Sequence, residues 1–582
     1  MNSLNILLAG NSGEGIQFLG KIFAYICTSL GNYISTFSDF PSEIRSPNNS
    51  KSGISVFKIQ ISNKKISYIG DKYDVFIVMN AFSLKKYLNK LKIGGIIIAD
   101  ISGFNKKQLK LAGYVENPLK NKNYIFYNIK IINKLNIKNN NMFILGFLCW
   151  FYNISINQIQ NLIKIKFFKK KIKINLILLK AGFFFGKKNF FLKEKKLKLI
   201  SNLKLKNYIN INGNEGLSLG LIAACKKANI KMFYSGYPIT PASEIFSYLS
   251  NIKINGIKTF QAEDEISAIT SSIGASYSGH LGITGTSGPG MSLKQEGLGL
   301  CFMLELPLVV INVQRAGPST GLPTKTEQSD LLQAFYGRHG ECPIPILASK
   351  SPYNCFYISF MACKIAIEYM TPVIILSDGY IANCYETCQI PKEKNLNKIK
   401  INYNKNIIYY PYERNKNGVR YWVPPGNIGF ENIIGGLEKK NLTGNVSTDK
   451  DNHEFMIKNR QNKINKIKKY LPIQKINIGK KKGKLLILSW GSTYGCITEA
   501  VKILIIKGYS VSSMHLEYLY PFPNGIKEII YNFEKILIPE INNGQLINII
   551  RNNFLIDPIA LNKIKGIPFT ISDIINKVYQ LI

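Results

Sequence analysis

The middle of the chain carries residues that could bind a small organic acid. The segment Gly236-Tyr-Pro-Ile-Thr240-Pro-Ala-Ser-Glu244 holds two prolines, which fix a rigid loop after an expected strand. Thr240 therefore presents a hydroxyl at the carboxyl end of that strand, where open α/β sheets bind ligands. Because Thr240 precedes a proline at an expected helix start, it is also the natural N-cap, so the segment is either a ligand contact or a helix start.

Three acidic residues, Glu263, Asp264 and Glu265, stand at the expected start of the next helix. Negative charge in a first turn suits the helix dipole, and this alone explains them structurally. A glutamate on such a helix could also exchange a proton with a ligand if it is shielded from water.

An arginine follows an apolar strand in Val313-Gln-Arg315-Ala-Gly-Pro-Ser-Thr320-Gly-Leu-Pro-Thr324. This position predicts a guanidinium that points into a crevice, where it could bind a carboxylate through two parallel hydrogen bonds. The structural alternative is a salt bridge at a surface or interface. A run of small residues, Thr284-Gly-Thr-Ser-Gly-Pro-Gly290, indicates a closely packed junction of strand and turn nearby.

A glycine-rich turn, Gly10-Asn-Ser-Gly13-Glu-Gly15, lies between an expected strand and helix. Glycines let backbone N–H groups approach an anion at a helix N-terminus. The spacing is neither that of the dinucleotide-binding turn nor that of the phosphate-binding P-loop. A tight turn without a ligand is the alternative interpretation.

These segments must be positioned by several domains, because 582 residues exceed what one hydrophobic core supports. Strands alternate with helices in three stretches, whereas proline, tyrosine, asparagine and lysine dominate between about 389 and 480. The pattern predicts an α/β protein with three open-sheet domains, the first two with parallel strands. The expected domains are 1–190, 205–388 and 481–582, with 389–480 as a connector of short irregular elements.

The net charge of +40 invites a nucleic-acid-binding interpretation. Lysine, however, occurs together with isoleucine and asparagine along the whole chain, which is typical of a compositional bias, and attraction of acidic partners is a third explanation. The ten cysteines contain no CxxC pair, the nearest being Cys384 and Cys388. Without a secretory signal or about 18 consecutive apolar residues, we expect a cytoplasmic protein that does not span a membrane.

Taken together, these segments resemble the 2-oxoacid:ferredoxin oxidoreductase family. The runs that match its alpha subunit in order and spacing are YPITPASE, EDEISAITSSIGAS, TGTSGPG and NVQRAGPSTGLPTKTEQSDL. Residues 1–190 resemble the gamma domain that some members carry fused ahead of alpha. The runs SWGSTYGCITEA and IPEINNGQL resemble the transketolase-like third domain, and GGLEKKNLTG and HEFMIKNRQNK are similar to parts of the connector. The three expected domains are then gamma-type, pyrimidine-binding-type and transketolase C-terminal-like.

The resemblance implies roles for four residues of the middle domain. Glu265 matches the glutamate that bonds the aminopyrimidine ring of thiamine diphosphate. Thr240, Arg315 and Thr324 match residues that hold the carboxylate and keto group of a 2-oxoacid, so Glu265, Arg315 and Thr240 are the expected catalytic residues. The resemblance also implies that coenzyme A (CoA) is a co-substrate.

For the glycine-rich turn, the resemblance implies a CoA-related, cofactor-binding role of Gly10, Gly13 and Gly15. The family pattern there is GxGGQG, and Glu14 replaces its glutamine. The nearby PSEIRSP (41–47) also departs from the more usual PEIRGG.

Other expected parts of the enzyme are missing from the sequence. Ser377-Asp378-Gly379 lacks the first glycine of a Gly-Asp-Gly motif, and no ferredoxin-type cysteine run occurs. The resemblance thus implies a separate beta subunit that carries the diphosphate site, Mg²⁺ and a 4Fe-4S cluster, and ferredoxin as acceptor. We expect a heterodimer, or two heterodimers related by two-fold symmetry, that converts 2-oxoglutarate to succinyl-CoA and CO₂. Pyruvate or another 2-oxoacid is the alternative substrate, and transfer of the acyl group to lipoamide is a rival that the gamma-like domain disfavours.

Overall fold

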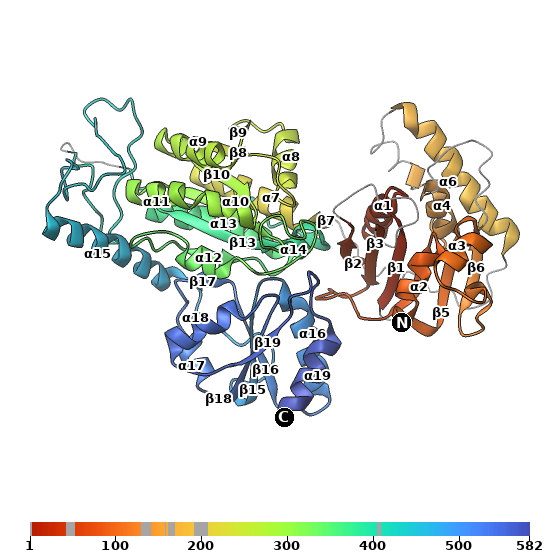
Figure 1. Ribbon diagram of the computed structural model, residues 1–582. Helices are drawn as coiled ribbons and strands as arrows, with labels where there is room; N and C mark the ends of the chain where they lie inside the picture. The colour runs from red at the N-terminus through yellow and green to blue at the C-terminus, as the bar shows by residue number, and fades with distance from the viewer. Residues whose placement is uncertain are drawn as a thin grey trace. The chain divides into compact units, whose positions relative to one another are not determined.

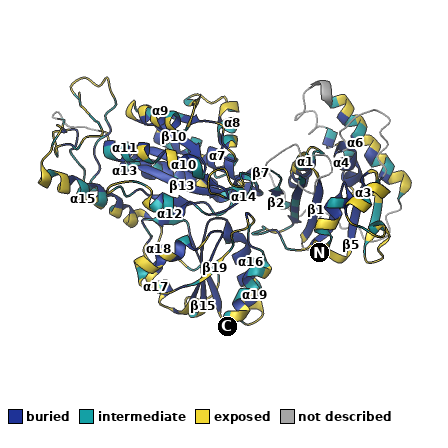
Figure 2. Cartoon of the chain, in the orientation of Figure 1, coloured by how far each residue is buried: buried dark blue, intermediate teal, exposed yellow. Residues whose placement is uncertain are grey.

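The computed structural model of the chain describes residues 3–41, 53–129, 141–157, 159–160, 169–190, 208–403 and 409–582 (Figure 1). Its contacts divide the chain into two compact units, Met1–Asn210 with Cys384–Ile390, and Ile211–Asn383 with Pro391–Ile582. Within the described residues the strands form three open sheets flanked by helices, which confirms the expected fold class. Figure 2 shows the strands buried and the outer faces of the helices exposed.

The first unit contains an eight-stranded sheet in the order β6-β5-β4-β1-β3-β2-β14-β7 among the residues described. Its strands are β1 (Ser3–Asn11), β2 (Tyr33–Asp39), β3 (Ile54–Ser62), β4 (Tyr73–Val78), β5 (Leu91–Asp100), β6 (Ile125–Ile129), β7 (Tyr208–Asn212) and β14 (Tyr385–Gln389). Its helices are α1 (Ile16–Ser29), α2 (Ala81–Tyr87), α3 (Lys106–Leu111), α4 (Asn141–Phe151) and α6 (Lys169–Asn189).

The prediction that this sheet is parallel was wrong for part of it. Strand β1 pairs in parallel with β4 but antiparallel with β3, and β3 pairs antiparallel with β2. Parallel neighbours need a crossover connection, usually a helix. The segment 63–72 between β3 and β4 contains no helix, so the alternation of strands and helices does not hold there.

Helix α4 is buried along its whole length. It packs against α6 at two glycines. A Cβ atom on Gly146 would meet the Leu179 carbonyl oxygen, and one on Gly182 would meet that of Phe143, both at 1.9 Å. The two backbones can approach this closely only because both residues lack a side chain.

The edge of the first sheet receives a strand from far along the chain. Strand β14 lies between β2 and β7, and the Thr387 hydroxyl accepts a hydrogen bond from Ile34 N at 3.0 Å. The Thr36 hydroxyl accepts one from Tyr385 N at 2.8 Å. No local sequence pattern predicts that the chain returns to this sheet.

The second unit contains the other two sheets found in the described residues. One has the order β17-β12-β13-β11-β10-β8-β9, with every neighbouring pair parallel except β12 and β17. Its strands are β8 (Met232–Gly236), β9 (Ile257–Gln261), β10 (Leu281–Thr286), β11 (Leu308–Gln314), β12 (Ile346–Ala348), β13 (Pro372–Asp378) and β17 (Tyr518–Tyr520). Its helices are α7 (Gly213–Ala228), α8 (Ser243–Asn251), α9 (Glu265–Tyr277), α10 (Gly288–Leu293), α11 (Gln295–Leu304), α12 (Leu331–Tyr336), α13 (Pro352–Tyr369) and α14 (Gly379–Asn383).

The third sheet is parallel, with the order β16-β15-β18-β19. It consists of β15 (Gly483–Trp490), β16 (Val511–Leu516), β18 (Phe533–Glu540) and β19 (Ile559–Asn562). Helices α16 (Tyr494–Ile506), α17 (Ile526–Ile530), α18 (Gln545–Phe554) and α19 (Ile571–Leu581) belong to it. Since β17 joins the second sheet, this C-terminal part is also tied to the preceding sheet through backbone pairing.

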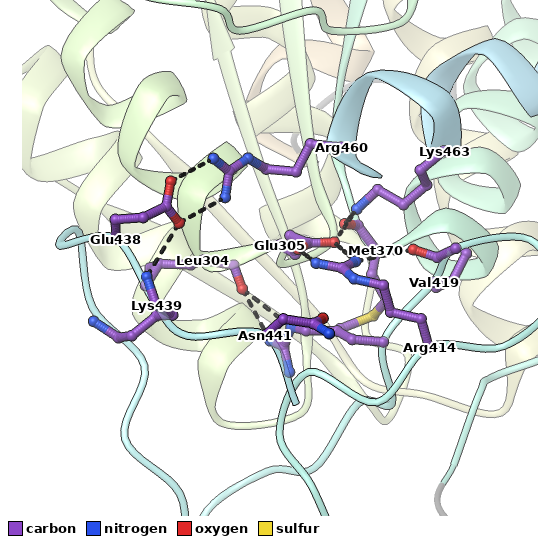
Figure 3. Close-up of polar contacts among 12 residues, drawn as sticks. Leu304, Glu305, Met370, Arg414, Val419, Glu438, Lys439, Asn441, Arg460 and Lys463 are labelled. Carbon is purple, nitrogen blue, oxygen red and sulfur yellow. Dashed lines mark hydrogen bonds and ion pairs between the residues drawn. The ribbon is translucent and has the colours of Figure 1, made fainter. Parts of the chain in front are cut away.

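The connector is less irregular than predicted, because it contains the 18-residue helix α15 (Lys450–Ile467). A buried carboxylate anchors it (Figure 3). Glu305, which ends α11, accepts hydrogen bonds from Arg414 Nη1 at 2.8 Å and from Lys463 Nζ at 2.5 Å. Burial alone would raise the pKa of Glu305, but the cations of Arg414 and Lys463 hold it well below its ordinary value. The connector is therefore packed against the second sheet's helices by compensated buried charge.

Candidate active site

The candidate residues of the middle segments lie at the carboxyl ends of β8, β9 and β11 and of their neighbour β10. Thr240 follows β8, Glu265 begins the helix after β9, and Arg315 comes directly after β11. Because these strands are parallel, their carboxyl ends meet at one edge of the sheet. The fold therefore gathers at that edge residues that are up to 75 positions apart.

Arg315 and Thr240 are in direct contact. The guanidinium Nη1 of Arg315 donates to the Thr240 carbonyl oxygen at 2.6 Å, and the Arg315 side chain is buried. Its Nε is also buried and has no hydrogen-bond partner among the residues that the structure describes. Burial lowers the pKa of Arg315, which Tyr237 and Asp330 oppose. A buried guanidinium with an unused donor suits an anionic ligand.

Thr240 does not cap the following helix, so the structural alternative for this segment is wrong. Helix α8 begins at Ser243, two residues beyond the expected start, with Ala242 at the N-cap position. The Ser243 hydroxyl accepts a hydrogen bond from Ile239 N at 2.7 Å and thus fixes the loop from the helix side. Thr240 is exposed, so its hydroxyl is available to a ligand.

Thr324 lies in the loop that follows Arg315. This loop folds back on itself, since Ala316 N donates to the Lys325 carbonyl at 3.0 Å and Leu322 N to the Ala316 carbonyl at 3.0 Å. These bonds bring the residues next to Arg315 and Thr324 into contact. The structure thus brings the backbone beside Thr324 against the backbone beside Arg315, and the Arg315 side chain contacts Thr240.

Glu265 occupies the first turn of α9, where Asp264 is the N-cap and accepts from Ser267 N at 2.8 Å. Its side chain is half-buried and lies near the Tyr237 hydroxyl, which is 2.8 Å from Thr286 Oγ1. A Cβ on Gly290 would come within 2.0 Å of that Tyr237 hydroxyl and 3.0 Å of Glu265 Cγ. Gly290 therefore lets the Tyr237 hydroxyl pack closely beside Glu265, because a side chain at this position would clash with both residues.

The structure adds a buried lysine that sequence reasoning missed. Lys294 Nζ donates to the Glu265 carbonyl at 2.7 Å and to Thr284 Oγ1 at 3.3 Å, and it lies 5.2 Å from the centre of the Tyr237 ring. Burial lowers the pKa of Lys294 to about 7, against the opposing charges of Glu265 and Asp264. Lys294 lies at the junction of α10 and α11.

A second missed residue is the buried carboxyl group of Asp330. Asn312 Nδ2 donates to it at 3.0 Å, and Gly288 leaves room for it, since a Cβ there would lie 3.0 Å from Asp330 Oδ1. Burial raises the pKa of Asp330 to about 6, and the Asn312 hydrogen bond and the charge of Arg315 oppose the rise. The site thus holds two carboxyl groups and two cations at the ends of adjacent strands. Neither Lys294 nor Asp330 stands out in the sequence, because polar and charged residues adjoin both of them.

The glycine-rich turn lies in the first unit. Gly13 and Gly15 both have positive φ angles, 93° and 75°, which glycine adopts without strain. The Glu14 carboxylate folds back and accepts from Asn11 N at 2.7 Å and Asn11 Nδ2 at 3.0 Å. A Cβ on Gly10 would lie 2.4 Å from Glu14 Oε2, so Gly10 makes room for this carboxylate. The turn therefore folds around the carboxyl group of its own residue Glu14. Burial is the main cause that raises the pKa of Glu14. The PSEIRSP segment lies outside the described residues except for Pro41.

Asp378 has a structural role in this fold. It is fully buried, and its Oδ1 accepts from Tyr380 N at 2.9 Å and from Ile381 N at 3.0 Å, which caps α14.

Across the described parts of the chain, no group of three or more His, Cys, Asp or Glu residues could hold a metal ion. In the same parts we find no helix with the length and apolar character needed to cross a membrane. Nine of the ten cysteines are buried, as expected of small core residues.

Comparisons with known proteins agree with the geometry. Residues 5–184 match the family model described as pyruvate ferredoxin/flavodoxin oxidoreductase, and residues 223–431 match the thiamine-diphosphate-binding model of the same enzymes. The chain is 39% identical to the 2-oxoglutarate oxidoreductase subunit KorA of Mycobacterium tuberculosis, over 99% of this chain and 91% of that one. It is 28% identical to the 2-oxoacid:ferredoxin oxidoreductase subunit alpha of a Sulfolobus species, over 93% and 90%.

A solved structure covers the same length. The 2-oxoglutarate:ferredoxin oxidoreductase from Magnetococcus marinus, with 2-oxoglutarate, coenzyme A and succinyl-CoA bound, superposes with a TM-score of 0.88. It is 32% identical and is matched over 100% of this chain and 99% of that one. The expected resemblance is thereby confirmed, and the chain belongs to the 2-oxoacid:ferredoxin oxidoreductase family, as an alpha subunit with an N-terminal gamma-type domain.

Proposed function

We propose that this chain, together with a beta subunit, catalyses the CoA-dependent oxidative decarboxylation of 2-oxoglutarate to succinyl-CoA and CO₂, with reduction of ferredoxin. The observation that carries this proposal is the contact of Arg315 with Thr240 beside Glu265 at one edge of the second sheet. The names of the full-length relatives and the ligands of the Magnetococcus enzyme support the choice of 2-oxoglutarate over pyruvate.

The 2-oxoacid is held by its carboxylate against Arg315. One guanidinium nitrogen is fixed by the Thr240 carbonyl, and Nε remains buried and unused. A carboxylate bound there regains the hydrogen bonds that burial removed from both groups. The hydroxyls of Thr240 and Thr324 lie on the two flanking loops and orient the keto group. Orientation of the bond that breaks is the main contribution of these residues.

The residues around Glu265 fit the aminopyrimidine ring of thiamine diphosphate. The Glu265 side chain is half-buried beside the Tyr237 hydroxyl. The hydroxyl of Ser287, which follows Thr286 in the chain, is buried without a hydrogen-bond partner among the described residues. When bound, thiamine diphosphate supplies a carbon nucleophile and an electron sink for decarboxylation. Glu265 exchanges a proton with the ring nitrogen, while Lys294 holds the backbone at Glu265.

A beta subunit is proposed to cover this edge. Three side chains adjacent to the site residues are apolar yet about half exposed: Ile266 at 52%, Leu293 at 54% and Leu322 at 52%. Exposed apolar groups around a polar centre are typical of an interface. Because Asp378 is used as a helix cap, we assign the diphosphate, Mg²⁺ and the 4Fe-4S cluster to that partner. The role of Gly10, Gly13 and Gly15 in CoA binding, and the cytoplasmic location, stay predictions.

The test is a coupled assay of this chain expressed with its beta partner under anaerobic conditions. Reduction of a viologen dye is followed with CoA and either 2-oxoglutarate, pyruvate or 2-oxobutyrate. We expect turnover of 2-oxoglutarate, with a loss of at least about 100-fold in kcat/KM for Arg315→Ala. The matched control is Arg551→Ala, which removes an exposed arginine paired with Asp557. Preference for pyruvate would overturn the substrate, and no turnover of any 2-oxoacid by the loaded pair would overturn the function.

A further inference from the structure

The loop that carries Thr324 is fastened at its far end to the C-terminal part of the chain. Gln328 is fully buried there. Its Nε2 donates to the Trp490 carbonyl at 2.8 Å, and its Oε1 accepts from Ile541 N at 3.0 Å. Its backbone N donates to the Ile541 carbonyl at 2.9 Å. Both polar ends of the side chain are thus satisfied by backbone groups at the carboxyl ends of β15 and β18.

Side chains of the same C-terminal part hold the residues next to Gln328. Asn542 Nδ2 donates to the Gln328 carbonyl at 2.7 Å. Gln545 Nε2 donates to the Ser329 carbonyl at 2.6 Å, and its Oε1 accepts from Leu332 N at 3.1 Å. These contacts involve the run IPEINNGQL, which had no role in the proposed chemistry.

The recess that holds the Gln328 side chain is itself fixed by hydrogen bonds. The buried Glu540 carboxylate accepts from Trp490 Nε1 at 3.1 Å, from Asn542 Nδ2 at 3.1 Å and from Leu546 N at 2.7 Å. Gly491 has a φ of 61°, and a Cβ there would lie 2.4 Å from Gln328 Nε2. The C-terminal part therefore provides a rigid recess shaped for an amide side chain.

The other side of the loop is bonded to the end of β11, next to the substrate residues. Asp330 N donates to Gln314 Oε1 at 3.1 Å, and Ser329 Oγ donates to the Arg315 carbonyl at 3.4 Å. Ala316 N donates to the Lys325 carbonyl at 3.0 Å. A shift of Gln328 out of its recess would thus be transmitted within a few residues to Arg315 and Thr324.

We propose that Gln328 is a positioning residue, through which the C-terminal part of the chain sets the geometry of the 2-oxoacid-binding loop. The assignment of that loop to the 2-oxoacid rests on the proposed function. Gln328 touches no reacting atom in this scheme, and its effect is on how well the substrate carboxylate meets Arg315. The C-terminal part then contributes to recognition of the 2-oxoacid without supplying a ligand to it.

The first measurement is hydrogen–deuterium exchange of the intact chain, which does not depend on activity. In Gln328→Ala, the backbone amides of 316–330 should exchange at least about tenfold faster than in the wild type, because the hydrogen bonds that hold the loop are lost. The control is Gln580→Ala, an exposed glutamine on α19, which should leave this segment unchanged. Unchanged exchange in Gln328→Ala would overturn the proposal.

The second measurement uses the complex with the beta subunit. We expect KM for the 2-oxoacid to rise about tenfold in Gln328→Ala while KM for CoA stays within about twofold, because only one substrate contacts this loop. Gln545→Ala, which loses the bond to Ser329, should shift the same constant and guards against misfolding of the first variant. Equal changes of both KM values would assign Gln328 a purely structural role. If the wild-type complex turned over no 2-oxoacid, the proposed function would fail, whereas the exchange experiment would still decide whether Gln328 holds the loop.

Discussion

Replacing Lys294 by methionine is expected to stabilise the protein and to impair the site. Lys294 is completely buried, and its pKa is lowered from an ordinary value of 10.5 to about 7, chiefly by burial. Keeping a proton on this amine thus costs about 5 kcal/mol relative to the unfolded chain. The hydrogen bonds to the Glu265 carbonyl and Thr284, which methionine cannot make, offset about 2 to 4 kcal/mol of the gain. The net stabilisation should be about 1 to 3 kcal/mol at pH 6.

The pH dependence of this gain makes the prediction specific. A lysine whose pKa is lowered on folding binds fewer protons in the folded than in the unfolded chain between the two pKa values. Stability of the wild type therefore rises with pH between about 7 and 10.5, and below pH 7 the full penalty applies. At pH 9 the penalty is about 2 kcal/mol, no more than the value of the lost hydrogen bonds, so the advantage of methionine should vanish or reverse.

The assay is thermal unfolding of the intact chain at pH 6 and pH 9, together with binding of thiamine diphosphate to the complex. At pH 6 the variant should unfold a few degrees higher than the wild type, and it should bind thiamine diphosphate less tightly because Glu265 loses its backbone anchor. Lys231→Met, at an exposed lysine that directly precedes β8, is the control and should change neither property. A variant that unfolds below the wild type at both pH values would refute the reasoning, because Lys294 would then be a net stabilising group.

Two further variants separate chemistry from stability. Glu265→Gln keeps the shape of a half-buried side chain but cannot exchange a proton, so kcat should fall by about 10²- to 10⁴-fold with little change in unfolding temperature; retained activity would remove Glu265 from the chemistry. Glu305→Gln leaves Arg414 and Lys463 buried without a counter-charge and should cost about 3 to 5 kcal/mol, measured by thermal unfolding against Glu499→Gln at a more exposed pair. Since the pKa of Glu305 is lowered on folding, wild-type stability should fall as the pH drops below its ordinary value of 4.5, and this dependence should be weaker in the variant.

The positions of Thr240, Glu265 and Arg315 could be predicted because each depends on local order. A residue that follows a strand of a parallel sheet lies at the carboxyl edge, whatever the rest of the fold does. The helix start beyond Thr240 was misplaced by two residues, since the Ser243 hydroxyl bonds the backbone of Ile239 and the helix begins there. Cap residues compete over one turn, and the sequence alone does not rank them.

Contacts between distant segments could not be predicted. Strand β14 joins the first sheet more than 300 residues after β2, and Gln328 enters a recess formed by residues 162 and 213 positions further on. Periodicity reports which face of an element is buried but not which partner buries it. Lys294 and Asp330 were missed for the same reason, because their burial depends on how neighbouring strands and helices meet.

The second unit contains two kinds of buried ionisable group, and the contrast between them supports the proposed site. Glu305 is matched by two cations, so its pKa moves toward the charged form despite complete burial. At the sheet edge, the pKa of Lys294 falls to about 7 and that of Asp330 rises to about 6, so both groups move toward the neutral form. A fold selected only for stability would pair such groups or replace them by apolar residues. Ionisable groups whose burial is only partly compensated, beside the unused donor of Arg315, are instead what the proposed site needs to receive a charged substrate and a cofactor.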